Sequence, residues 1–267
     1  MKTIKIVFAN IYQGLLYEEK VGQKDVFSKY RPSVYVEQYS DLQPDIVCLA
    51  EAPLDDEEGN SKFIRDFTEK IGGVDARTDV RAQSWLLEDK YYGNAIISKL
   101  PIKDYRALNL PHPHLEYDRP DGDHWVMHDN AVQSGIINLG GFDIKLFNLH
   151  YFPYFFFGRN MNEPEFAESR QAFIDHLRLA DGIPTILTGD FNNGDADLET
   201  AYPELFMDDA LTDAVKFDES DFNERYVGGA YQLDHILYTS DKFKVINKQV
   251  ITDHSDHKGL LVELSIV

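Results

Sequence analysis

The chain has 267 residues, of which 43% are apolar, enough for a substantial core in one large domain or two small ones. It carries 46 acidic and 26 basic residues, and the resulting net charge of -20 excludes a broad basic surface for duplex DNA. A single cysteine excludes an intrachain disulfide and is compatible with a reducing compartment.

Organisation along the chain is uniform. There is no Pro/Gly/Ser-rich linker, low-complexity tract or repeat, so we expect one domain over residues 1–267. The N-terminus alternates like a strand and lacks the apolar region of a signal peptide, and no segment is long enough to cross a membrane. We therefore expect a cytoplasmic monomer without a membrane span.

The first predicted strand ends in a polar residue. Ile4, Ile6 and Phe8 alternate with other side chains, which predicts a strand that ends at Asn10 and opens into a polar loop. A polar group at the end of a buried strand is often displayed for binding or chemistry. Asn10 is therefore a candidate site residue.

A second polar residue follows another buried strand. A helix over residues 34–42 leads into an apolar strand over residues 46–50, which delivers Glu51 beside an acidic loop. A solvated strand end is the alternative for Glu51. Cys48 lies inside the strand, which favours a buried apolar residue over a nucleophile.

The central part of the chain mixes regular segments with one irregular one. We expect a helix over residues 61–71 and strands over 84–87 and 92–98. Between residues 109 and 130, prolines and a glycine argue against regular structure, and four histidines crowd together: His112, His114, His124 and His128. Either a metal site or a polar loop fits them; without cysteine partners the loop is favoured, and a loop this long suits a substrate-facing lid.

A predicted hairpin comes next. Strands over residues 131–139 and 142–149, joined by two glycines, deliver His150 directly before an aromatic run over residues 151–157. A lone histidine at a strand end is usually structural. The aromatic run either packs in the core or stacks on a substrate, and the sequence leaves both readings open.

The most informative turn follows the next strand. A helix that begins near Asn162 and ends at 181–182 feeds an apolar strand over residues 183–187, which stops at Gly-Asp-Phe-Asn. Asp190 and Asn192 then present a carboxylate and a carboxamide, although an ordinary Asx turn is the alternative. We expect further strands over residues 233–238, 243–250 and 259–264, with Asp256 and His257 directly before the last.

Seven short motifs, in this order, resemble the endonuclease/exonuclease/phosphatase superfamily of metal-dependent phosphoesterases. They are Phe8-Ala9-Asn10, Pro44-Asp45-Ile46-Val47-Cys48-Leu49-Ala50-Glu51, Gly93-Asn94-Ala95-Ile96-Ile97-Ser98, Asn148-Leu149-His150, Thr188-Gly189-Asp190-Phe191-Asn192, Leu233-Asp234-His235-Ile236-Leu237 and Ser255-Asp256-His257. The resemblance covers nearly the whole chain. It implies a four-layer α/β sandwich, in which two mixed β-sheets pack face to face with helices outside and strand ends converge on the active site.

The resemblance also implies roles for the strand-end residues. Glu51 would bind Mg²⁺ or Mn²⁺, supported by Asn10 and Asp256, because a hard cation prefers oxygen ligands. Asp190 would orient and deprotonate the attacking water, and Asn192 would position the phosphate or the water.

Two histidines complete the implied catalytic set. His257, held by Asp234, would donate to a non-bridging phosphoryl oxygen. His150 is similar to the second histidine of the deoxyribonuclease-like branch, which would protonate the leaving oxygen. Asn10 and Asn94 would position the substrate. Ala50 departs from the pattern, because many relatives have a glutamine there, and this alters the floor beside the metal ligand.

Several functions are compatible with this chain. A metal-dependent phosphodiesterase or nuclease and a hydrolase of a small phosphorylated molecule share the same site, whereas a catalytically inactive phosphate-binding module and a zinc protein built on the four histidines are the alternatives. The arginines are scattered along the sequence, at Arg77, Arg81, Arg106, Arg119 and Arg159. We therefore predict a small phosphoester or a short or single-stranded nucleic acid as substrate, reached through segments 109–130 and 151–157.

Overall fold

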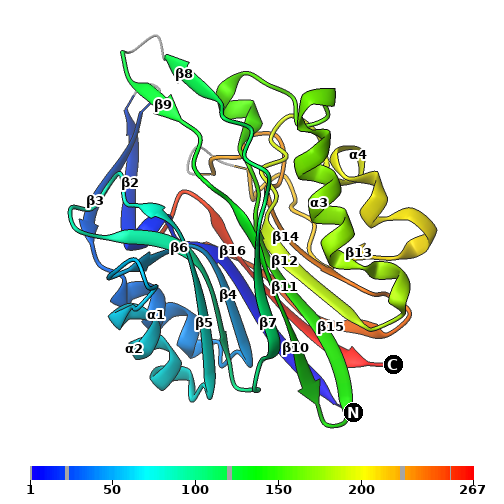
Figure 1. The fold of residues 1–267 in the computed structure, drawn as a ribbon. Helices are drawn as coiled ribbons and strands as arrows, with labels where there is room; N and C mark the ends of the chain where they lie inside the picture. Colours follow the sequence, from blue (N-terminus) through cyan, green and yellow to red (C-terminus); the bar gives the residue numbers. More distant parts are fainter. Residues whose placement is uncertain (1, 22–23, 119–121, 223–225, 253) are drawn as a thin grey trace.

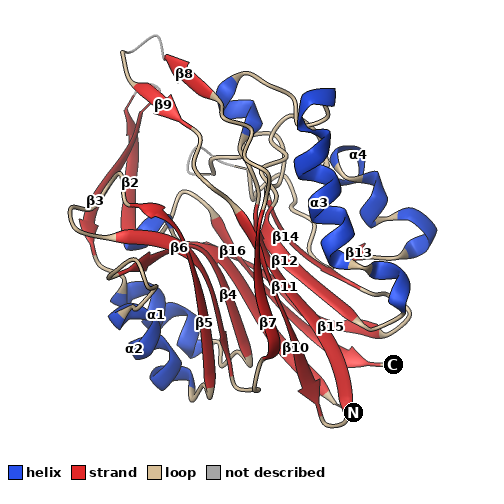
Figure 2. Ribbon diagram, in the orientation of Figure 1, coloured by secondary structure: helices blue, strands red, loops and turns tan. Residues whose placement is uncertain are grey.

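A computed structural model describes residues 2–21, 24–118, 122–222, 226–252 and 254–267. Two six-stranded sheets lie face to face, with α1 (Ser33–Asp41) and α2 (Lys62–Ile71) outside one and α3 (Ala167–Leu177) and α4 (Leu198–Ala201) outside the other (Figures 1 and 2). The predicted four-layer α/β sandwich is confirmed.

The first sheet contains the N-terminal and C-terminal strands. Its strand order is β15-β16-β1-β4-β6-β5. The strands are β1 (Thr3–Asn10), β4 (Ile46–Leu54), β5 (Asp75–Gln83), β6 (Tyr91–Ser98), β15 (Phe243–Thr252) and β16 (Lys258–Ile266). β1 and β4 run parallel and the other neighbours antiparallel, so the sheet is mixed.

The second sheet contains the strands from the middle of the chain. Its strand order is β13-β14-β12-β11-β10-β7. The strands are β7 (Lys103–Asn109), β10 (Ala131–Leu139), β11 (Phe142–His150), β12 (Thr185–Asp190), β13 (Thr212–Asp213) and β14 (Asp234–Tyr238). β11 and β12 are its parallel pair, so this sheet is mixed as well.

Alternation along the strands builds the layers. In β1, Ile4, Ile6 and Phe8 enter the core between the sheets, whereas Val7 and Ala9 face the core that α1 and α2 cover. The central strands β1, β4 and β12 are almost continuously apolar, as expected for strands that are buried on both faces. Each fully buried Ile or Phe side chain contributes about 1.5–3 kcal/mol through removal from water.

The register of the strands brings the polar ends to one edge. His150 pairs with Asp190 across the parallel β11–β12 pair, and Asp190 pairs with Asp234 across the antiparallel β12–β14 pair. In the other sheet, Asn10 pairs with Ala50, and an irregularity between Leu49 and Ala52 accompanies a positive φ of 51° at Glu51. The convergence at this edge follows from pairing, which the chain order alone does not specify.

Two hairpins stand outside the sheets. They are formed by β2 (Leu15–Val21) with β3 (Lys24–Tyr30) and by β8 (Glu116–Asp118) with β9 (His124–Val126), and they rise on the same side of the sandwich (Figure 1). The expectation that residues 109–130 lack regular structure is therefore wrong. Tyr117 pairs with Trp125 across the two strands, and this pairing stabilises a hairpin that the prolines in the sequence argue against.

The predicted strand over residues 84–87 is also wrong. Ser84 Oγ accepts hydrogen bonds from the backbone N–H groups of Leu86 and Leu87, at 3.0 and 2.7 Å, and folds the segment into a turn. Such local bonds compete with strand pairing. The helix expected to extend to residue 181 ends earlier, because Arg178 adopts a left-handed conformation after Leu177.

None of the helices in the described ranges combines the length and the apolarity that a membrane crossing requires.

Candidate active site

Asn10 connects two carboxylates at the edge where the strands converge. Its Nδ2 donates to Glu51 Oε1 at 3.2 Å and to Asp190 Oδ2 at 3.0 Å, while its Oδ1 accepts from the backbone N–H of Tyr12 at 3.1 Å. Asn10, Glu51 and Asp190 are all buried, the last with 1% of its surface exposed. A side chain from β1 thus holds residues from β4 and β12 side by side.

His257 also lies close to the Asp190 carboxylate. Its Nδ1 lies 2.8 Å from Asp234 Oδ2 and its Nε2 lies 3.8 Å from Asp190 Oδ2. Asp234 starts β14 and is fully buried, so the ring is fixed by a charge-assisted hydrogen bond shielded from water. Nε2 is left as the nitrogen that can serve the site.

The turn after β12 holds the carboxylate of Asp190 in place. Asp190 Oδ1 accepts from the backbone N–H of Asn192 at 3.0 Å, and Asn192 Nδ2 donates to the carbonyl of Tyr151 at 2.7 Å. Asn192 has a positive φ of 49°, a conformation that asparagine tolerates better than most residues. Gly189 permits the close packing here, since a Cβ would approach Leu149 O to 2.6 Å.

His150 and Asn94 occupy different positions around this cluster. His150 Nε2 lies 3.9 Å from both Glu51 Oε1 and Asp190 Oδ2, and its Nδ1 has no hydrogen-bond partner among the described residues. Asn94 is fully buried in β6, where its Nδ2 donates to the carbonyl of Ala131 at 3.4 Å. It supports the main chain that pairs with His150 and does not line the cavity described below.

Burial sets the protonation of the cluster. It raises the pKa of Glu51 to about 7, reinforced by the negative charge of Asp256, and it raises the pKa of Asp190 to about 7 as well. Burial opposes the charged form of His257, but the carboxylates of Asp234 and Asp190 outweigh it and raise the pKa of this ring well above its usual value. Burial and the positive charge of His257 lower the pKa of His150 to about 3.

The donor set suits a hard divalent cation. Glu51 Oε2 is buried without a hydrogen-bond partner among the described residues, and Glu51 and Asp256 both line the cavity. A second set of residues that could hold a metal ion consists of Asp190, Asp234 and His257, whose ligand atoms lie within 4.8 Å of one another. His257 and Asp234 already form a hydrogen bond with each other, so the unpaired Glu51 oxygen is the better-supported metal ligand.

A cavity of about 490 Å³ opens onto these groups. Its lining residues come from many separate parts of the chain and include site residues, both outer hairpins and the aromatic run. They are Tyr12, Phe27, Glu51, Trp85, Tyr92, Asp123, His124, Trp125, Val126, Met127, His128, Asn130, His150, Pro153, Phe156, Phe157, Asp190, Asn192, Val227, Asp256 and His257. In the part of the chain that the structure describes, no lysine or arginine lines this cavity.

The aromatic run divides between the core and the cavity. Tyr151, Phe152 and Tyr154 are buried in the core beneath α3, whereas the half-buried Phe156 and Phe157 line the cavity. Trp85, Tyr92, Tyr12 and Phe27 also line it, and sequence reasoning did not connect them with the site. Their only signal was aromatic character, which a core residue shares.

Of the four clustered histidines, two lie beside each other and the other two contact different partners. His112 Nδ1 lies 3.1 Å from His114 Nδ1, His124 Nδ1 lies 2.8 Å from Asp118 Oδ1, and the His128 ring stacks on Trp85. Within the described ranges, these histidines do not form a group of three metal-ligating residues. The lid expectation for segment 109–130 fits better, because its β9 strand and His128 line the cavity.

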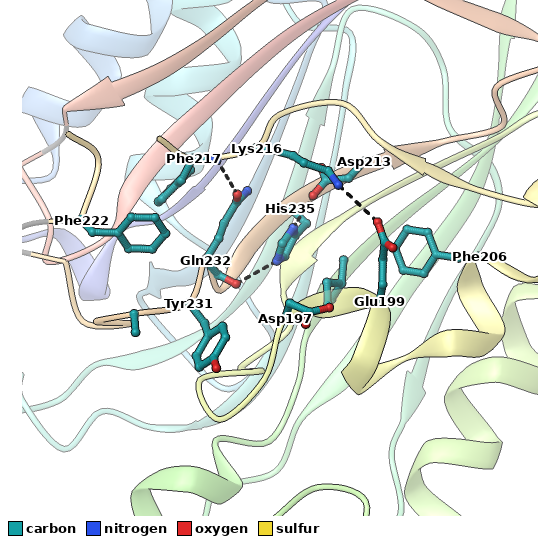
Figure 3. Close-up of a pocket in the computed structure, with 12 residues that line it drawn as sticks. Asp197, Glu199, Phe206, Asp213, Lys216, Phe217, Phe222, Tyr231, Gln232 and His235 are labelled. Carbon is teal, nitrogen blue, oxygen red and sulfur yellow. Dashed lines mark hydrogen bonds and ion pairs between the residues drawn. The ribbon is translucent and has the colours of Figure 1, made fainter. Parts of the chain in front are cut away.

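A second cavity, of about 330 Å³, lies beside β14 (Figure 3). His235 spans it, with Nδ1 2.7 Å from Asp213 Oδ2 and Nε2 2.9 Å from the carbonyl of Gln232. Gln232 uses Oε1 for Phe217 N–H and Nε2 for the carbonyls of Val215 and Asp234. Both ring nitrogens and the amide are thus engaged in the protein itself, which gives this cavity a structural character.

The arginines seen in the sequence are largely neutralised. Arg77, Arg81 and Arg159 form ion pairs with Asp75, Asp79 and the pair Glu163 and Glu165. Arg119 lies outside the described residues.

A family model described as the Endonuclease/Exonuclease/phosphatase family matches residues 24–257. The chain belongs to this family. Endonuclease/exonuclease/phosphatase family members are generally divalent-metal-dependent hydrolases of phosphoester bonds. The resemblance inferred from the seven motifs is confirmed.

Solved structures of the endonuclease/exonuclease/phosphatase family share the fold. The family protein from Beutenbergia cavernae DSM 12333 is 16% identical, with a TM-score of 0.68 over 100% of this chain and 72% of that one. The human Nocturnin catalytic domain with a bound sulfate anion is 17% identical, with a TM-score of 0.67 over 100% and 94%. A mannosyl-6-phosphatase from Bacteroides thetaiotaomicron VPI-5482 is 18% identical, with a TM-score of 0.57 over 98% and 99%. A search of curated protein sequences finds no match.

Proposed function

We propose that this protein is a divalent-metal-dependent phosphoesterase that hydrolyses a small phosphorylated molecule or a short single-stranded nucleic acid end. The bridge formed by Asn10 carries the proposal, because it holds Glu51 and Asp190 side by side on one cavity. Phosphoester hydrolysis needs a cation site and a base for water within reach of the same phosphoryl group.

Glu51 and Asp256 are the proposed ligands of Mg²⁺ or Mn²⁺, supported by the unpaired Glu51 Oε2. When bound, the cation would neutralise charge on the phosphoryl oxygens. Asn10 offers its N–H groups to carboxylates and its oxygen to Tyr12, so its proposed contribution is to orient Glu51 and to position the substrate site.

Asp190 is the proposed base. It takes the proton of the attacking water, the new oxygen–phosphorus bond forms, and the bond from phosphorus to the leaving oxygen breaks. Asn10 and the backbone N–H of Asn192 hold its two oxygens, at 3.0 Å each, and so fix the direction of proton transfer. Asn192 lines the cavity, where we propose that it positions the phosphate or the water.

The histidines are proposed as hydrogen-bond donors. His257, charged and held by Asp234, donates from Nε2 to a non-bridging oxygen as negative charge develops there. His150 has a pKa lowered to about 3 by burial, so its ring is neutral at pH 7. We therefore propose that it gives the leaving oxygen a hydrogen bond, while the proton itself comes from solvent.

The net charge and the lining of the cavity support a small substrate. The net charge of -20 and the cavity lining without lysine or arginine among the described residues disfavour tracking along duplex DNA. Burial raises the pKa of Cys48 to about 12, so this thiol is a poor nucleophile.

A substrate screen tests the proposal. Phosphomonoesters and phosphodiesters would be assayed with Mg²⁺ and with Mn²⁺, alongside Asp190→Asn as the matched inactive variant. Turnover that requires the metal and Asp190 supports the phosphoesterase. Binding of inorganic phosphate without turnover of any ester would instead support the catalytically inactive phosphate-binding module.

A further inference from the structure

The cavity surrounds its polar floor with aromatic rings. Tyr12 stacks on Phe27 with ring centroids 3.8 Å apart and planes inclined by 12°, at the base of the β2–β3 hairpin. Trp125 on β9 meets Phe156 edge to face at 5.8 Å. Both pairs line the cavity, so rings from four distant segments face one space.

Trp85 is the most accessible of these rings. It is 47% exposed, stacks on His128 at 4.9 Å with an angle of 18°, and meets the edge of Tyr92 at 4.7 Å. A large apolar ring held in a fixed orientation and left half open to solvent is a surface on which a planar group can stack.

Charge limits what else the cavity accepts. Glu51, Asp123, Asp190 and Asp256 line it, and the lining residues in the described ranges include no lysine or arginine. A metal ion and His257 can offset the charge of one phosphoryl group, but a second phosphate would meet these carboxylates without a lysine or arginine to pair with it, and the lining histidine His124 already pairs with Asp118. The volume of about 490 Å³ also matches one small molecule rather than a polymer.

We infer that the cavity selects a phosphoester whose leaving group carries one planar aromatic ring system, such as the base of a nucleoside monophosphate, and that bears no second phosphate. This inference rests on the proposed phosphoesterase function. Hydrolysis breaks the bond between phosphorus and the 5′ oxygen, water supplies the new oxygen on phosphorus, and the nucleoside oxygen takes up a proton.

Three substrates distinguish the contribution of the aromatic base from that of the phosphoryl group. Adenosine 5′-monophosphate and ribose 5-phosphate share the same type of leaving oxygen and differ in the base, whereas adenosine 5′-diphosphate adds one phosphate. We expect kcat/KM with Mg²⁺ or Mn²⁺ to be about 5- to 100-fold higher for the monophosphate than for ribose 5-phosphate, the range of one stacking contact. The diphosphate should be hydrolysed more slowly than the monophosphate.

Variants identify the responsible ring. Trp85→Ala should lower kcat/KM for adenosine monophosphate by about 5- to 100-fold and leave ribose 5-phosphate unchanged. Phe142→Ala is the control, because Phe142 is 48% exposed on the β10–β11 turn and lies outside the cavity. Trp125→Ala provides a second test on a separate hairpin.

Other outcomes would overturn the inference. Equal hydrolysis of ribose 5-phosphate and adenosine monophosphate would do so, as would faster hydrolysis of the diphosphate or of a single-stranded oligonucleotide. If no ester is hydrolysed, the proposed function fails, and calorimetric titration with adenosine, which needs no tryptophan as a reporter, decides separately. Adenosine binding that Trp85→Ala abolishes would then support the aromatic cavity, and absence of binding would refute it.

Discussion

Asp234→Asn tests how far catalysis depends on the charge behind His257. The substitution keeps the volume of the side chain, and the amide oxygen can still accept from His257 Nδ1, 2.8 Å from the present carboxylate oxygen. The other oxygen, Oδ1, has no hydrogen-bond partner among the described residues, so the new amide nitrogen disturbs no existing bond. The main loss is therefore the negative charge.

The size of the effect follows from distance and burial. Both side chains are buried, and two opposite unit charges about 4 Å apart attract by about 4 kcal/mol at an effective dielectric constant of about 20. If half of this stabilisation is used as charge develops at phosphorus, turnover falls about 30-fold; if all of it is used, turnover falls about 1000-fold.

The neighbouring His–Asp pair provides a matched control. Asp213 Oδ2 lies 2.7 Å from His235 Nδ1, so Asp213→Asn removes the same kind of charge from the same kind of contact (Figure 3). His235 does not line the cavity with Asp190, and we expect Asp213→Asn to retain kcat within threefold. Turnover, melting temperature and circular dichroism would be measured for both. An Asp234→Asn enzyme that folds and works within threefold of wild type would refute the assigned role of the pair.

Three further predictions concern the metal and the base. Mg²⁺ or Mn²⁺ should raise the melting temperature of the wild type, because a ligand stabilises the folded state that binds it. In thermal denaturation, the melting temperature of Glu51→Gln should rise much less when the metal is added. Equal rises in the two proteins would exclude Glu51 as a ligand. Burial raises the pKa of Glu51 to about 7, so its carboxyl is increasingly protonated as the pH falls from 8 to 6, and the metal-induced rise should shrink over that range; a rise independent of pH would contradict this competition. Asp190→Asn should lower kcat at least about 100-fold without unfolding, measured beside circular dichroism, and a near-normal rate would reject Asp190 as the base.

The site residues could be predicted because each is a polar residue that directly follows or precedes an apolar, strand-like stretch of sequence. Asn10, Glu51, Asp190 and His257 each lie at the end of an apolar stretch, and their order matched a family pattern. Their roles remain predictions, as does a single domain over residues 1–267. The Asn10 bridge could not be predicted, because it depends on how β1, β4 and β12 lie in two different sheets.

The cavity walls escaped prediction for a different physical reason. Strand periodicity indicates burial on one face, but Trp85 lies on a turn, and Trp125 and Phe27 lie on two short hairpins that are ordered by cross-strand pairing. Trp85 was assigned to a strand because its neighbours are apolar, whereas Ser84 instead makes the local bonds of a turn.

The polar residues of the cavity and its aromatic residues therefore belong to different parts of the fold. The polar floor is built from strand residues whose relative positions follow from sheet register, and the proposed phosphoryl-transfer roles belong to these residues. The aromatic walls come from segments outside the sheets, which can change without disturbing that register. Substitution of Trp85 should therefore alter which ester is chosen and not how its bond is broken, whereas substitution of Asp190 should stop hydrolysis of every ester alike.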